Sequence, residues 1–98
     1  MWTTFRGGLE TLFGNARSIK IKLETIGGHG STIADLVKHL CLNLMTDKRT
    51  DLFVIDDFQV RPGVLVLIND ADWELEGQET YKVKPGDDIL FASTLHGG

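Results

Sequence analysis

The segment that decides the fold is Thr32-Ile-Ala-Asp-Leu-Val-Lys-His-Leu-Cys-Leu-Asn-Leu-Met45. Its apolar residues recur at spacings of three and four, which places them on one face of a helix. They are Ile33, Leu36, Val37, Leu40, Cys41, Leu44 and Met45. Thr32 can cap the helix, and Asp35 adds negative charge to its first turn. The helix is predicted to end near Asp47, where Lys48 and Arg49 suit its negative end.

Two strands are predicted before this helix, over Trp2–Arg6 and residues 18–23. In the second, Ile19, Ile21 and Leu23 alternate with lysines, so one face is solvated. Glycines in the connection between the strands favour an antiparallel pair.

Further strands are predicted after the helix. Val64–Ile68 is an apolar run, typical of a strand with both faces partly covered. A turn leads to a short strand over Trp73–Leu75, and a second turn leads to a strand over residues 89–93. The segment containing Leu52, Phe53 and Ile55 is read as a link. Two strands, a helix and further strands predict an α+β fold of the β-grasp type, with a mixed sheet of four to five strands covered by one main helix.

Length and composition limit the classes of function that this chain can have. Ninety-eight residues, 42% of them hydrophobic, are enough for one compact domain. The net charge of −4 disfavours direct binding of nucleic acid, which needs clustered cations. Cys41 is the only cysteine, so no intrachain disulfide forms. Neither a signal peptide nor a membrane-spanning stretch is recognised, so we expect a cytoplasmic monomer without membrane contact.

For three groups of residues that could form a functional site, an ordinary structural role is favoured over a functional one. The glycine-rich loop before Thr32 could hold a phosphate, but it lacks the lysine of a P-loop. His39 and Cys41 lie near Asp35, yet Cys41 falls on the apolar face of the helix, where a thiol stays inert. The paired aspartates lie beside turn residues and lack the calcium-loop pattern. No catalytic residue and no metal site are predicted, while Trp73 and Tyr81 are expected to pack against the sheet.

Two segments carry a resemblance to a known family. The run Arg61-Pro-Gly-Val-Leu-Val-Leu-Ile-Asn-Asp-Ala-Asp-Trp-Glu-Leu-Glu-Gly77 and the ending Ser93-Thr-Leu-His-Gly-Gly98 closely resemble the ubiquitin-related modifier family. The likeness extends through the helix and the early segment containing Gly7-Gly8 and Leu12-Phe13. It implies a ubiquitin-like β-grasp domain over residues 1–94 and a flexible Gly-Gly tail over residues 95–98.

The resemblance also implies a function as substrate and carrier rather than as enzyme. In that family an E1-like enzyme adenylates the terminal carboxylate with ATP, and its sulfurtransferase domain converts the adenylate to a thiocarboxylate. A tRNA thiolase complex then passes the sulfur to the wobble uridine of tRNA. Members are also conjugated to lysines of target proteins. No permanently bound cofactor is implied.

The tail residues have distinct expected roles. Gly98 would carry the acyl group, Gly97 would be the thin link, and Leu95 and His96 would be recognised by the activating enzyme. Glycine has no Cβ, so such an end can enter a narrow active site. With no residue after Gly98, no protease would be needed to expose the carboxylate. The alternatives are a frayed terminus on a non-covalent docking module, or a sulfur carrier for molybdopterin or thiamine synthesis.

Overall fold

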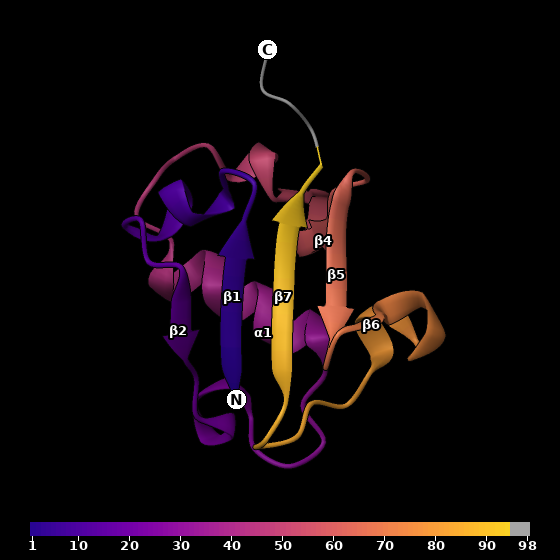
Figure 1. Cartoon of the computed structure of the whole chain (residues 1–98). Helices are drawn as coiled ribbons and strands as arrows, with labels where there is room; N and C mark the ends of the chain where they lie inside the picture. The colour runs from indigo at the N-terminus through magenta and orange to yellow at the C-terminus, as the bar shows by residue number, and fades with distance from the viewer. Residues whose placement is uncertain (95–98) are drawn as a thin grey trace.

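The computed structural model describes residues 1–94. Five strands form one mixed sheet in the order β2-β1-β7-β5-β6, and helix α1 crosses one face of it (Figure 1). The strands are β1 (Trp2–Arg6), β2 (Ser18–Lys20), β5 (Val64–Ile68), β6 (Ala71–Asp72) and β7 (Asp88–Ser93), and α1 spans Ile33–His39. This arrangement confirms the predicted β-grasp fold.

Smaller elements connect these strands, and several of them pack against α1. A two-stranded sheet pairs β3 (Val54–Ile55) with β4 (Gln59–Val60). A π-helical turn, η3 (Leu40–Leu44), extends α1. The single 3-10 turns are η1 (Leu9–Phe13), η2 (Leu23–Ile26), η4 (Thr50–Leu52), η5 (Asp56–Phe58), η6 (Trp73–Leu75) and η7 (Gln78–Thr80).

The centre of the sheet is a parallel pair formed by the first and last strands. β1 runs beside β7 from the Trp2–Asp88 pair to the Arg6–Ala92 pair. The predicted antiparallel pairing of β1 with β2 is confirmed, and β5 pairs antiparallel with the other edge of β7. The end of β7, where the described chain stops, therefore lies between β1 and β5 (Figure 1).

Aromatic side chains fill the space between the sheet and the helix. Phe5 stacks on Phe13 with ring centroids 4.1 Å apart, and Phe91 meets Phe53 edge-on at 5.1 Å. Phe5, Phe53 and Phe91 are fully buried. Edge-on and stacked rings contribute beyond the apolar area that they bury. Trp73 and Tyr81 pack against this core, as predicted.

The start of the helix agrees with the prediction and its end does not. The hydroxyl of Thr32 accepts from Asp35 N, and Thr32 N donates to the Asp35 carboxylate, which makes a capping box. The α-helix stops at His39 rather than near Asp47, and η3 follows it. The amide of Thr46 donates instead to Leu12 O at 2.8 Å, so a tertiary hydrogen bond diverts the chain.

Three other predictions need correction. The second strand ends at Lys20, because residues 23–26 form η2. Trp73–Leu75 is a 3-10 turn and not a strand, since the Asp72 carboxylate caps it by accepting from Glu74 N at 2.9 Å. The predicted link around residue 53 holds β3 and a core phenylalanine, Phe53.

A buried carboxylate fixes the turn before β7. Asp87 accepts hydrogen bonds from Asn69 Nδ2 at 2.9 Å, from the Tyr81 hydroxyl at 2.7 Å and from Lys84 N at 2.9 Å. Burial by itself raises the pKa of Asp87, but these three donors outweigh burial and hold it below its usual value. Burial and the bond to Asp87 raise the pKa of Tyr81 to about 12.

The variant Asp87→Asn is expected to change how stability depends on pH. Because the folded pKa of Asp87 is depressed, its contribution is present above the unfolded pKa, about 3.9, and is lost as pH falls through the folded pKa. At neutral pH the variant should lose about 1–3 kcal/mol of unfolding free energy. Urea unfolding over a pH series measures this loss. The prediction would be contradicted if the unfolding free energies of the two proteins fell equally steeply as the pH is lowered.

Candidate functional site

The face of the sheet opposite α1 carries an apolar patch. Strand alternation turns Val64, Val66 and Ile68 into the core and leaves Leu65 and Leu67 on the other side. Leu65 pairs with Ala92, and Leu67 pairs with Leu90, so these four side chains are neighbours. We call them the open-face patch. Leu65 is 37% exposed and the other three are partly buried. The outer face of this strand is therefore only partly covered, as predicted, while its inner face is buried.

Charged side chains of opposite sign border the open-face patch. Arg6 pairs with Ala92, so it flanks the patch on β1. Asp88 pairs with Trp2 on the same face, near the start of β7. A hollow of about 410 Å³ between these charges is lined in part by Trp2, Leu67 and Leu90. An apolar centre with a charged rim is the anatomy of a protein-docking surface rather than of a small-molecule site.

The other half of the candidate site is the end of β7. Thr94 is the last described residue, and both its amide and its hydroxyl donate to Gly63 O, at 2.8 and 2.6 Å. The predicted site residues Leu95, His96, Gly97 and Gly98 lie outside the described residues. Thr94, which precedes them, lies at the end of the central strand β7, close to the Ala92–Leu65 pair. The end of β7 and the open-face patch therefore lie close together.

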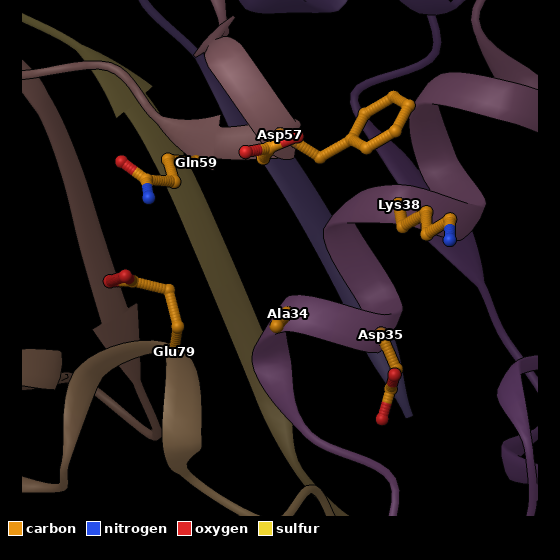
Figure 2. A pocket seen from close by; sticks show the side chains of 7 residues that line it. Ala34, Asp35, Lys38, Asp57, Gln59 and Glu79 are labelled. Atoms are coloured by element: carbon orange, nitrogen blue, oxygen red, sulfur yellow. The ribbon is translucent and has the colours of Figure 1, made fainter.

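A second hollow lies between α1 and the segments around residues 57 and 79 (Figure 2). Its volume is about 320 Å³, and Asp35, Asp57 and Glu79 line it together with Lys38. Asp35 is already engaged in the capping box. Within residues 1–94, no group of three His, Cys, Asp or Glu side chains is placed to hold a metal ion. We assign no chemistry to this hollow.

His39 and Cys41 do not form a catalytic pair. Cys41 is half-buried, and burial raises its pKa to about 11, so the thiol stays protonated and unreactive at neutral pH. The ring Nδ1 of His39 lies 3.1 Å from Asn43 Nδ2. Asp35 bonds to Thr32 rather than to the histidine. These positions agree with the predicted structural roles of the three residues.

A single helix on a five-stranded sheet, with an open apolar face beside the end of the last strand, defines a β-grasp protein of the ubiquitin-like class. Residues 1–98 match the family described as Urm1 (Ubiquitin related modifier). The chain belongs to this ubiquitin-related modifier family.

Relatives from several eukaryotes support the assignment. The chain is 62% identical over 96 residues to ubiquitin-related modifier 1 of Coccidioides immitis, covering 96% of this chain and 83% of that protein. It is 49% identical over 94 residues to the Drosophila grimshawi homolog, covering 96% of this chain and 86% of that protein. The solution structure of Urm1 from Trypanosoma brucei matches with a TM-score of 0.81 at 37% identity, over 99% of this chain and 93% of that one.

One further comparison concerns the fold alone. The crystal structure of the Amycolatopsis orientalis BexX/CysO complex contains a chain that matches with a TM-score of 0.73 at 20% identity, over 99% of this chain and 98% of that one. Among the described residues, no helix is both long and apolar enough to cross a membrane.

Proposed function

We propose that this ubiquitin-related modifier is a sulfur carrier whose reactive group is the carboxylate of Gly98. An E1-like enzyme uses ATP to form the acyl adenylate and releases pyrophosphate. A persulfide on its sulfurtransferase domain attacks the carbonyl carbon and expels AMP, and a thiol then cleaves the acyl disulfide to leave the thiocarboxylate. Activation is needed because a free carboxylate repels nucleophiles. Leu95, His96 and Gly97 form the segment that the active site must recognise and admit.

The observation that carries this proposal is the position of Thr94, the residue before the tail, next to the strand ends that bear the open-face patch. The proposal has the globular body dock through Leu65, Leu67 and Leu90 while the residues after Thr94 enter the active site. Four residues span at most about 14 Å. The docking surface must therefore lie close to the active site that receives the end, and the patch meets this requirement.

The proposed destinations of the sulfur and of the modifier follow the family. A tRNA thiolase complex would accept the sulfur for 2-thiolation of the wobble uridine, and lysines of target proteins would accept the modifier itself. In the first reaction this chain donates sulfur, and in the second it is itself transferred to the lysine. In both, the enzymes supply the catalytic groups. The cytoplasm, where these reactions would be located, is part of the same proposal.

Mass spectrometry of the intact protein tests the proposal. Incubation with the E1-like enzyme, ATP and a sulfur donor should replace one oxygen of the terminal carboxylate by sulfur. The competing function is a non-covalent ubiquitin-like docking module. An unchanged mass together with retained binding to the enzyme would favour that module, and no sulfur transfer would then be expected.

A charge placed in the open-face patch is expected to weaken docking. Leu65→Asp should raise the KM for thiocarboxylation roughly 30-fold, because truncation of a central interface residue commonly costs about 2 kcal/mol. Its effect on the fold should be small, since the side chain is 37% exposed. Leu75→Asp is the matched control, because Leu75 is 80% exposed, lies in η6 and is not one of the four residues of the patch. Equal KM values for the two variants would exclude the patch as the docking surface.

A further inference from the structure

The end of β7 is held by close backbone contacts on both of its sides. On one side, Gly7 follows β1 and lies against the backbone of Ser93. A Cβ built on Gly7 would come within 2.2 Å of Ser93 O. On the other side, Gly63 O accepts both the amide and the hydroxyl of Thr94. We call Gly7, Gly63 and Thr94 the collar.

The sequence builds each side of the collar locally. Gly63 follows Pro62 in a turn closed by Val64 N donating to Arg61 O at 3.1 Å. Its φ of 98° is one that glycine adopts without strain, and this turns its carbonyl toward β7. Gly7 has a φ of 70° and leads the chain from β1 into η1. The parallel pairing of Arg6 with Ala92 then brings Gly7 directly beside Ser93.

We infer that Gly7, Gly63 and Thr94 are positioning residues that fix where, and in which direction, the tail leaves the sheet. This inference rests on the proposed function. Gly98 is the fourth residue after Thr94, so a displacement of Thr94 by an ångström uses a noticeable part of the distance that these residues can span. A misplacement of about 1 Å at a reacting centre can reduce a rate about 100-fold. The collar therefore sets the effective concentration of the carboxylate in the active site, while the open-face patch sets the affinity.

A substitution that disturbs the collar is expected to lower kcat for thiocarboxylation and to leave KM nearly unchanged. Gly7→Ala should lower kcat about 10- to 100-fold with little change in KM, because Ser93 must move away from the new methyl group. Gly8→Ala is the matched control. Gly8 also has a positive φ, 99°, but a Cβ there meets no atom within 4 Å. Its φ lies further from the left-handed region that alanine tolerates, so Gly8→Ala should be strained at least as much, yet it should keep the kcat of the wild type.

A second set of variants decides the question if Gly7→Ala does not fold. Thr94→Val removes only the hydroxyl bond to Gly63 O and should lower kcat about 3- to 10-fold. Thr94→Ser keeps the hydroxyl and should restore most of the rate. A kcat for Thr94→Val equal to that of the wild type overturns the inference. So does a rise in KM that simply follows a fall in melting temperature across the variants.

Amide hydrogen exchange separates this inference from the proposed function. The Thr94 amide should be protected in the wild type and in Gly8→Ala, and should exchange faster in Gly7→Ala. A wild-type protein that gains no sulfur overturns the proposed function. An unprotected Thr94 amide in a wild type that does gain sulfur overturns the collar alone.

Discussion

Addition of a single alanine after Gly98 is expected to abolish thiocarboxylation while leaving thermal unfolding unchanged. The added residue moves the free carboxylate onto an alanine, which bears a Cβ, and lengthens the tail by about 3.5 Å. A site shaped to adenylate a terminal glycine then meets a peptide bond where it needs a carboxylate. Residues 1–94 are unaltered in this variant, so every contact that the structure describes is kept. Intact-mass analysis after incubation with the E1-like enzyme, ATP and a sulfur donor measures the result.

Gly98→Ala separates tail length from the identity of the last residue. This variant keeps the carboxylate at its original distance from Thr94 and adds only a methyl group. It should retain part of the rate, whereas the extended protein should show none. Sulfur uptake by the extended protein at the wild-type rate would show that Gly98 is not the acyl carrier.

Phe91→Ala is expected to cause the largest loss of stability in the molecule. Phe91 is fully buried on β7, with its ring centroid 5.1 Å from that of Phe53 and 6.1 Å from that of Phe5. Removal of a buried phenylalanine ring leaves a cavity and typically costs 3–5 kcal/mol, which is a large share of the stability of a small domain. Urea unfolding followed by fluorescence or circular dichroism measures the change.

Leu75→Ala is the control for this prediction. The side chain of Leu75 is 80% exposed, so its truncation should change the unfolding free energy by less than about 0.5 kcal/mol. A cost below about 1 kcal/mol for Phe91→Ala would mean that the aromatic cluster is not the centre of the core. The same strand also presents Leu90 and Ala92 on its outer face, so Phe91→Ala should impair docking only through loss of the folded state.

Local chemistry made several features predictable from the sequence. The Thr32 cap with Asp35 in the first turn, the first strand and the strand over Val64–Ile68 depend on residues that are neighbours in the chain. The predictions failed where a distant group decided the outcome. The α-helix gives way to the π turn η3, whose winding stops at Met45 just before Thr46 N bonds to Leu12 O, and β3 pairs with β4 in a segment predicted to be a link.

The open-face patch could not be predicted from the sequence for a related reason. All five residues of Val64–Ile68 are apolar, so the run does not show which side faces the helix. Only the register with β7 assigns Leu65 and Leu67 to the outer face, next to Ala92 and Leu90. An open apolar face of this kind therefore cannot be recognised from periodicity when both faces of a strand are apolar.

The sequence by itself determined the order of the four main strands and the helix, the apolar face of the helix and the membership of the ubiquitin-related modifier family. Tertiary structure alone decided that β1 lies parallel to β7, which places Gly7 against Ser93 although the two are at opposite ends of the chain. The physical reason is the range of the interactions. Hydrophobic periodicity records which side of an element avoids water, but the partner that covers it, and the glycine that lets two backbones approach, depend on how the whole chain packs.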